Sequence, residues 1–273
     1  SNYKYAGPAF WTTVAWAEAA VLDLLGKASG KSIGDLLGGR KRDRVPVYVS
    51  SLIRETTPEE EVEWVGRRIE QTKAKAVKLK IGGRLSRNAD ASPGRSERLI
   101  ALARRTWGSG MKIYVDANGS YDARHSLEVA KMLKEHGVAF FEEPCPFEDL
   151  DATRAVADAL EMPVAGGEQD ARLPRFEYMA RARVVDILQP DMLYNGGFTS
   201  REWRSVQLLA QIDGRSAERD GLEDAMVGEN TGGSVLYAAP GLGWQTGPGL
   251  AGERPVSGPM RPRLYGGPTE RRA

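Results

Sequence analysis

Short apolar runs alternate with amphipathic segments along residues 45–191, and this alternation constrains the fold more than any other feature of the sequence. The runs are typical of buried strands, and the segments between them have helical spacing. The predicted strands are VPVYVS (45–50), AVKLKI (76–81), KIYVDAN (112–118), FFEEP (140–144), PVAGGE (163–168) and ILQPD (187–191). Repeated βα units predict a parallel sheet, and six in one run favour a closed (β/α) barrel of the TIM type over an open doubly wound sheet.

The two ends of the chain follow other patterns. The first segment is a predicted helix that stops at Gly30 and places apolar side chains at helical spacing, namely Val14, Ala17, Val21 and Leu24. A second short helix is predicted over Ser32–Leu37. After residue 210 the Gly-, Pro- and Arg-rich sequence offers weak seventh and eighth strands near Gly233–Ala238 and Gly243–Thr246. We therefore divide the chain into helices at 1–44, a barrel at 45–250 and a basic tail at 251–273.

The composition favours a small-molecule substrate over nucleic acid or a membrane. The 38 basic and 37 acidic side chains balance, so no strong electrostatic field is expected. No apolar run approaches the roughly 18 residues of a membrane span, and the single cysteine, Cys145, cannot form an internal disulfide. We expect a cytoplasmic protein and leave a homo-oligomer open. The chain begins at Ser1 without Met or a signal pattern, which we attribute to processing or truncation.

Acidic residues end four of the predicted strands. Asp116, Glu142, Glu168 and Asp191 are separated by 26, 26 and 23 residues, about one βα unit each, so a barrel would place them at one face. A single acid here is usually a helix cap or a solvated charge, but several close together repel one another unless a cation neutralises them. Carboxylates without a His or Cys cluster suit Mg²⁺. We predict Asp116, Glu142 and Glu168 as ligands, with Glu143 in a supporting position.

Lys78 and Lys80 are two residues apart on one predicted strand, so their side chains point to the same face. Two ammonium groups so close are expected to lower each other's pKa, and a lysine with a lowered pKa can act as a general base near neutral pH. An isolated Lys-x-Lys pair more often faces solvent on an edge strand. This pair lies within an apolar strand one unit before the first acid, which favours a catalytic pair.

The segments VKLKIGG, VDANGSYD, FFEEPC, GGEQD and LQPDMLYNGGFT, in this order, resemble the enolase superfamily and its mandelate racemase-like group over residues 10–205. The resemblance implies that Lys80 abstracts the proton α to a carboxylate, with Lys78 as its neighbour. It also implies that Mg²⁺ stabilises the resulting enediolate. The metal ligands implied by the same positions are Asp116, Glu142 and Glu168.

Other positions separate the subgroups of this family. The resemblance implies substrate-binding roles for Asn118 and Gln189. Asp191 takes the place of the aspartate in the Asp-His dyad of the racemase-like group, where the muconate lactonising group has a lysine. The two histidines of the chain, His125 and His136, both fall in the predicted helix after the third strand. The dyad histidine is therefore missing, which disfavours racemisation with two bases.

These features predict a Mg²⁺-dependent lyase or isomerase of the acid-sugar dehydratase type, acting on a small carboxylate. A non-catalytic, metal-binding remnant of the family is one alternative, and a muconate-type cycloisomerase or racemase is another. Family members begin with an α+β capping domain, and residues 1–44 resemble its last helices. The substrate and its stereochemistry do not follow from the sequence.

Overall fold

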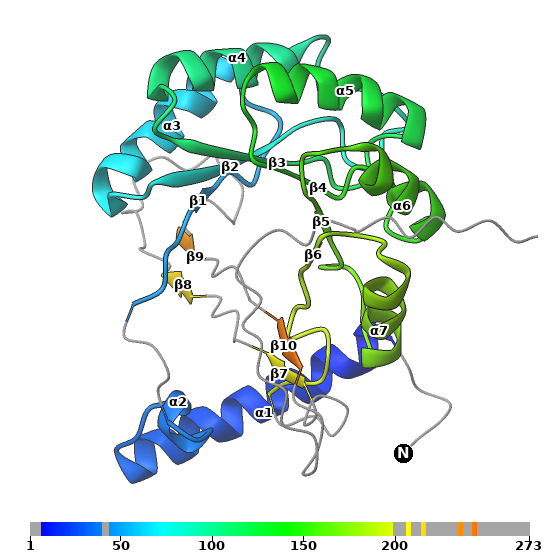
Figure 1. The fold of residues 1–273 in the computed structure, drawn as a ribbon. Helices are drawn as coiled ribbons and strands as arrows, with labels where there is room; N and C mark the ends of the chain where they lie inside the picture. Colours follow the sequence, from blue (N-terminus) through cyan, green and yellow to red (C-terminus); the bar gives the residue numbers. More distant parts are fainter. Residues whose placement is uncertain are drawn as a thin grey trace, which may run out of the picture.

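A sheet of six parallel strands forms the centre of the molecule. The computed structural model describes residues 7–39 and 44–198 and, beyond them, the backbone of four three-residue strands. Each strand of the sheet pairs with the next one along the chain (Figure 1). The strands are β1 (Val49–Ser50), β2 (Ala76–Lys80), β3 (Lys112–Asp116), β4 (Phe140–Glu142), β5 (Val164–Gly166) and β6 (Ile187–Leu188). This order confirms the predicted parallel α/β fold.

One helix separates each strand of the sheet from the next. The helices are α3 (Pro58–Thr72), α4 (Arg95–Trp107), α5 (Ala123–Glu135), α6 (Leu150–Ala159) and α7 (Leu173–Ala182). Local sequence signals set their starts. Thr57 and Glu60 form a reciprocal capping box at the start of α3, and Pro58 occupies its first turn. The Asp122 carboxylate accepts from the backbone N–H of His125 and caps α5.

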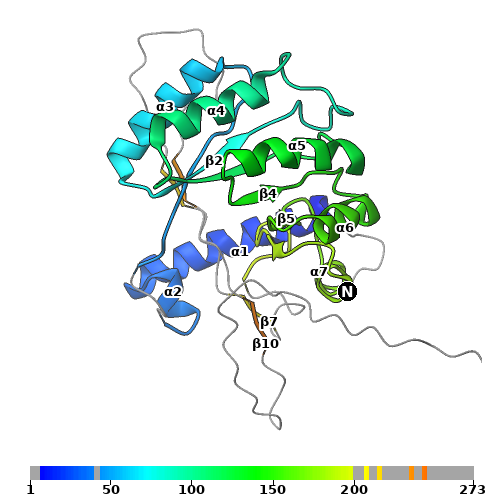
Figure 2. The same cartoon turned by 45° about the horizontal axis from the view of Figure 1, so that its top comes forward.

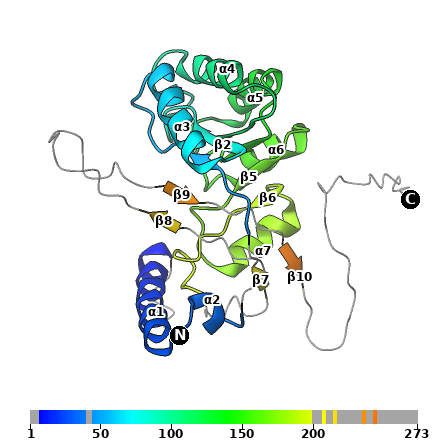
Figure 3. The ribbon, with the colours of Figure 1, turned by 90° about the vertical axis from the view of Figure 1, so that its left-hand side faces the viewer.

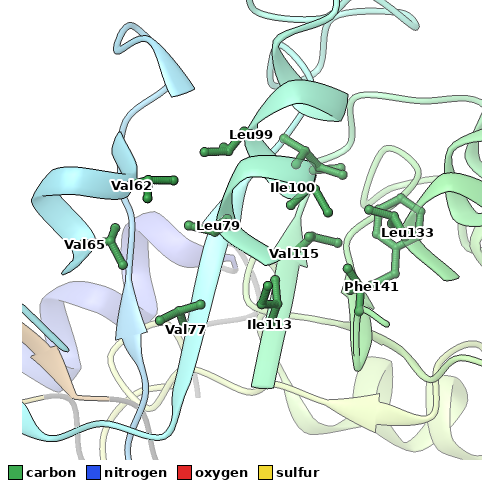
Figure 4. Close-up of a cluster of buried hydrophobic side chains, with 14 of the residues drawn as sticks. Val62, Val65, Val77, Leu79, Leu99, Ile100, Ile113, Val115, Leu133 and Phe141 are labelled. Atoms are coloured by element: carbon green, nitrogen blue, oxygen red, sulfur yellow. The ribbon is translucent and has the colours of Figure 1, made fainter. Parts of the chain in front are cut away.

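The main core lies between the sheet and the helices α3, α4 and α5. Figure 4 shows Leu79 of β2 and Val115 of β3 beneath the side chains of Leu99 and Ile100 from α4. All four are fully buried. A second core lies farther along the chain, where Phe176 and Met179 of α7 pack with Val164 of β5. The apolar faces of the predicted helices therefore cover one side of the strands.

Strand register brings the charged residues to one edge of the sheet. Lys80 lies opposite Asp116 in the β2–β3 pair, and Asp116 lies opposite Glu142 in the β3–β4 pair. Parallel strands have their carboxyl ends at the same edge, so residues one unit apart in sequence become neighbours there. Acids that lie one βα unit apart in the sequence are therefore neighbours at the edge of the sheet.

Helices α1 (Pro8–Ser29) and α2 (Ile33–Leu36) lie away from the row formed by α3–α5 (Figures 2 and 3). As predicted, α1 ends at Gly30 in the left-handed conformation, and Ser32 caps α2. The predicted apolar face of α1 is nevertheless exposed: Val14, Val21 and Leu24 are 37%, 54% and 66% exposed. The inward face instead follows the series Trp11, Ala15, Glu18, Leu22 and Gly26.

The turn that follows β6 carries the contact with α1. A Cβ atom placed on Gly196 would lie 2.6 Å from Trp11 Cε3, so only glycine allows the indole to approach this closely. The Glu18 carboxylate accepts from the backbone N–H of Phe198. A helix at the start of the chain therefore packs on a loop about 180 residues later.

The four strands beyond the sheet form antiparallel pairs. They are β7 (Val206–Leu208), β8 (Gly214–Ser216), β9 (Ser234–Leu236) and β10 (Leu242–Trp244), paired as β7 with β10 and β8 with β9. The weak strand predictions near 233–238 and 243–246 thus coincide with β9 and β10, but the expected parallel pairing is not observed. Parallel pairing needs a long, usually helical crossover, and this Gly- and Pro-rich sequence lacks helical periodicity.

Across the described residues, no helix combines the length and the apolar character that crossing a membrane requires. The basic tail predicted at 251–273 lies outside the described residues. The division into helices at 1–44 and a barrel at 45–250 remains a prediction.

Candidate metal centre and active site

Three of the predicted carboxylates meet at the carboxyl edge of the sheet. Asp116, Glu142 and Glu168 each place an oxygen within 4.8 Å of the others. Asp116 and Glu142 end β3 and β4 and are fully buried, whereas Glu168 follows β5 in a turn and is partly exposed. Glu168 is therefore the most accessible of the three acids.

The two lysines of β2 point into the same cluster. Lys78 Nζ lies 2.7 Å from both carboxylate oxygens of Glu142 and 3.8 Å from Asp116 Oδ2. Lys80 Nζ donates to Asp116 Oδ2 and, at 3.1 Å, to Asn118 Oδ1. The lysine side chains are 2% and 10% exposed, so Lys80 is the more accessible ammonium group.

The prediction of a lowered pKa for this lysine pair is wrong for Lys78. Burial alone would lower the pKa of Lys78, but the carboxylates of Glu142 and Asp116 outweigh burial and raise this pKa well above its usual value. The sequence argument considered the two ammonium groups and left out the acids opposite them. The two acids therefore favour the charged form of Lys78.

The acids respond differently to their surroundings. Burial acts to raise the pKa of Asp116, but the ammonium groups of Lys80 and Lys78 hold it below its usual value. Burial raises the pKa of Glu142 to about 7, with Asp116 and Glu168 acting in the same direction and Lys78 opposing them. Neighbouring carboxylates whose pKa values are shifted in opposite directions are typical of functional sites.

Asn118 lies at the centre of the cluster. Its side-chain NH₂ group donates to Asp116 Oδ2, Glu143 Oε2 and Glu168 Oε1 at 3.1, 3.2 and 3.3 Å. Gln189, also predicted here, donates from Nε2 to Glu142 Oε2 at 2.9 Å. Both amides predicted to bind substrate are therefore at the carboxylate cluster.

Glu143 reaches the cluster from an unusual backbone conformation. Its φ of 42° ends the alternation of β4, so its side chain meets Asn118 and does not point away from the site. Burial, followed by the neighbouring Glu168 and Asp116, raises the pKa of Glu143 to about 9. Glu143 thus contacts the cluster through the Asn118 amide.

The remaining predicted residues lie in other surroundings. Asp191 Oδ1 accepts from the backbone N–H of Leu193 at 2.7 Å and so helps to form the turn after β6. His125 lies on α5, 3.2 Å from Glu128, and His136 ends the same helix. Neither histidine belongs to the carboxylate cluster.

Sequence reasoning missed Arg54. This residue lies in the loop between β1 and α3, and its guanidinium donates to Asn118 Oδ1 and to the backbone oxygen of Asp116 at 2.9 and 3.3 Å. Its position a few residues beyond the carboxyl end of a predicted strand is the signal that could have identified it.

The donor set fits a hard divalent cation. Its ligand atoms are carboxylate oxygens, which Mg²⁺ prefers. Two further buried oxygens close to the cluster, Glu143 Oε1 and Gln189 Oε1, have no hydrogen-bond partner within the described part of the chain. The oxygens of Asp116, Glu142 and Glu168 therefore form a donor set that suits a divalent cation.

The parallel βα fold, with acids and lysines at the carboxyl ends of its strands, defines a parallel-sheet α/β protein with a cluster of charged groups at one edge. The family model described as "Enolase C-terminal domain-like" matches residues 60–245, more than half of the chain. The chain belongs to this family, and the predicted resemblance to the enolase superfamily is confirmed.

Individual proteins agree with this membership. Arabinonate dehydratase from Saccharolobus solfataricus is 33% identical over 207 residues, which cover 74% of this chain and 52% of that protein. A crystal structure of a proposed racemase from Roseobacter denitrificans is 40% identical with a TM-score of 0.66, covering 72% of this chain and 53% of that chain. The chain thus spans about half the length of these proteins.

A second structure was solved with a metal. The mandelate racemase/muconate lactonizing protein from Paracoccus denitrificans, complexed with magnesium, is 32% identical with a TM-score of 0.59. The similarity covers 65% of this chain and 48% of that chain.

Proposed function

We propose that this chain carries the site of a Mg²⁺-dependent lyase or isomerase that abstracts the proton α to a carboxylate, in the manner of an acid-sugar dehydratase. The observation that carries the proposal is the cluster of Asp116, Glu142 and Glu168, whose oxygens lie within 4.8 Å of one another beside two buried lysines. The name of the arabinonate dehydratase relative supports a sugar acid as the substrate class.

Lys80 is the proposed base. It is the more accessible lysine, and Asn118 and Asp116 hold its ammonium group at the edge of the cluster. A base must be able to lose its proton and turn toward substrate, whereas Lys78 is fixed between Glu142 and Asp116. Lys78, held between these two acids, is proposed to supply a positive charge beside the substrate carboxylate.

The carboxylates Asp116, Glu142 and Glu168 are proposed to hold the metal. Bound Mg²⁺ would supply positive charge next to the oxygen that becomes negative when the α-proton leaves. Asn118 and Gln189 are proposed to orient substrate hydroxyl groups, a role supported by the position of both amides at the cluster. Asp191 is proposed as a further catalytic residue, with its Oδ1 engaged by the turn after β6.

The setting of this site is part of the proposal. The predicted helices at 1–44 would belong to a capping domain, and the barrel would extend over 45–250. We propose a cytoplasmic location, with a small sugar acid as the partner and a homo-oligomer left open.

Calorimetric titration of the purified chain with Mg²⁺ tests the metal site. Asp116→Asn and Glu168→Gln should each weaken binding at least about tenfold, since each removes one charged ligand of a cation that depends on carboxylates. Asp158→Asn, an exposed acid on α6, is the matched control and should bind as the unmodified chain does.

Solvent-deuterium exchange into a panel of sugar acids, followed by proton NMR, tests the chemistry. Mg²⁺-dependent exchange at the α-carbon would support a proton-abstracting enzyme, and loss of water from the same acid would favour the dehydratase. Metal binding without exchange would favour the non-catalytic remnant. If the intact chain bound no Mg²⁺, the enzyme proposal would be wrong.

A further inference from the structure

Arg54 joins the loop after β1 to the ends of two other strands. Its Nε donates to the backbone oxygens of Ile81 and Gly82 at 3.2 and 3.0 Å. Its Nη2 donates to the backbone oxygen of Asp116 at 3.3 Å. One planar, permanently charged group therefore fixes the carboxyl ends of β2 and β3 relative to each other.

The same guanidinium also fixes the orientation of the Asn118 amide. Asn118 Oδ1 accepts from Arg54 Nη2 at 2.9 Å and from Lys80 Nζ at 3.1 Å. The NH₂ group on the other side faces the carboxylates of Asp116, Glu143 and Glu168. A reversed amide would place its NH₂ against two cations and its oxygen against three acids, which is strongly unfavourable.

Asn118 requires such support because its backbone is constrained. Its φ of 43° lies in the left-handed region, and the residue is 6% exposed. Non-glycine residues in this region persist when their surroundings hold them. The Asp116 carboxylate holds the Asn118 backbone N–H at 2.8 Å, and Arg54 and Lys80 hold the side chain.

Arg54 differs from Lys80 in the kind of acceptor it contacts. Within the described residues its four side-chain acceptors are three backbone oxygens and one amide oxygen, and none is a carboxylate. A guanidinium used for charge alone would pair with an acid, as Arg175 does with Asp170. The geometry of Arg54 is suited to orienting dipoles.

We propose that Arg54 is a positioning residue that acts through Asn118 to set the distance between the Lys80 ammonium and the carboxylates of the metal site. The inference rests on the proposed function for its catalytic consequence, but the Arg54–Asn118 contact can be tested without turnover. If Arg54 only tethered the β1 loop, its loss would lower stability and leave Asn118 and the proton-transfer rate unaffected.

The first test follows the side-chain amide of Asn118 by NMR, with its resonances assigned from their loss in Asn118→Ala. Arg54→Met should shift these resonances and speed exchange of the amide protons with solvent by about tenfold, because one of the two Oδ1 donors is lost. Arg84→Met removes a positive charge near Arg54 from an exposed position and should leave the amide unchanged. An Asn118 signal unaffected by Arg54→Met would overturn the proposal, whether or not the chain is active.

The second test is a double-mutant cycle on deuterium exchange into the best sugar acid. Arg54→Met should lower kcat about 10- to 100-fold with KM within about threefold, since misplacing a base costs the chemical step more than binding. Arg54→Lys, which keeps the charge but not the fork of donors, should recover part of this loss. In the Asn118→Ala background the further loss should be below about threefold. Additive losses would show that Arg54 does not act through Asn118.

Discussion

The strand ends of β2–β4 bury charged side chains, whereas the helix α1 exposes apolar ones. At the strand ends, charged groups are buried: Lys78, Asp116 and Glu142 are at most 2% exposed. Along α1, apolar groups are exposed, with Trp16 at 64% and Leu24 at 66%. The first region is held by complementary charges within a rigid sheet, whereas α1 is held mainly by its inward face.

The two regions differ in what stabilises them. Burying an ammonium or a carboxylate is costly unless it is paired, so a cluster of this kind must be maintained by function or by a bound cation. An exposed apolar face adds little to the stability of the chain that carries it. We therefore expect substitutions at the strand ends to alter chemistry and substitutions along the outer face of α1 to have slight effects.

The largest expected effect is that of Lys80→Met. Removal of the proposed base should slow deuterium exchange into substrate about 10²- to 10⁴-fold, the range typical of a general base. NMR of the substrate measures the rate. Lys112→Met, at the exposed start of β3, is the control and should change the rate less than about twofold. Exchange that persists in Lys80→Met would transfer the base to another residue.

Leu99→Ala tests the core beneath the site. Leu99 is fully buried between α4 and the sheet, so its truncation should lower the free energy of unfolding by about 3 kcal/mol. Urea unfolding followed by circular dichroism gives this value. A loss below about 1 kcal/mol would mean that the core around β2 repacks and that the strand ends are less rigid than the contrast with α1 requires.

Gly196→Ala tests the contact of α1 with the turn after β6. The added methyl would meet Trp11 at 2.6 Å in a backbone with φ of 82°, and we expect a loss of about 2 kcal/mol in the free energy of unfolding. Gly30→Ala is the control without the steric contact, because its φ is 65° in the left-handed region and nothing lies within 4 Å of the added atom. Equal losses in the two variants would show that α1 does not press on this turn.

Glu143→Gln tests how the buried carboxyl of Glu143 makes the stability of the chain depend on pH. The pKa of Glu143 is about 9 in the folded chain and about 4.3 when unfolded. The folded chain thus keeps a proton that the unfolded chain loses, and this group makes stability fall as pH rises from about 4 to 9. In metal-free protein, glutamine should remove that slope and add about 1–2 kcal/mol at pH 9.

Urea unfolding at several pH values with a chelator present measures the slope for Glu143→Gln. Glu70→Gln, exposed on α3, should keep the slope of the unmodified chain. If the free energy of unfolding changed with pH equally in both variants, ionisation of Glu143 would not destabilise the folded chain.

Leu24→Ser is expected to have the smallest effect. The side chain is 66% exposed, so the free energy of unfolding should change by no more than about 0.5 kcal/mol. A loss close to that of Leu99→Ala would show that the outer face of α1 is covered in solution. That outcome would remove the contrast between the two regions.

Periodic features of the sequence predicted most of the fold and the positions of the candidate site. The parallel sheet followed from apolar runs one βα unit apart, and the meeting of Asp116, Glu142 and Glu168 followed from acids at their ends. The observed caps Thr57 and Asp122 are likewise local signals, since each acts over three or four residues. Each of these signals is local or repeats at a fixed interval.

Features that depend on distant partners were not predictable in this way. The Arg54 guanidinium bonds to Asn118, 64 positions away, and no periodicity links the two residues. The raised pKa of Lys78 depends on acids from two other strands. The inward face of α1 was misassigned because hydrophobicity favoured Val14 and Leu24, whereas the contact is made by Trp11 and Glu18 against a glycine turn.

The contact between α1 and the turn after β6 also has a consequence for synthesis on the ribosome. Each strand of the sheet pairs with the next one along the chain, so the sheet can assemble progressively as the chain emerges. Helix α1 emerges before the strands of the sheet, but its place against Gly196 and Phe198 exists only after about 180 further residues have been made. Helix α1 therefore docks after the strands that follow it in the chain, and its inward face is available to chaperones throughout that interval.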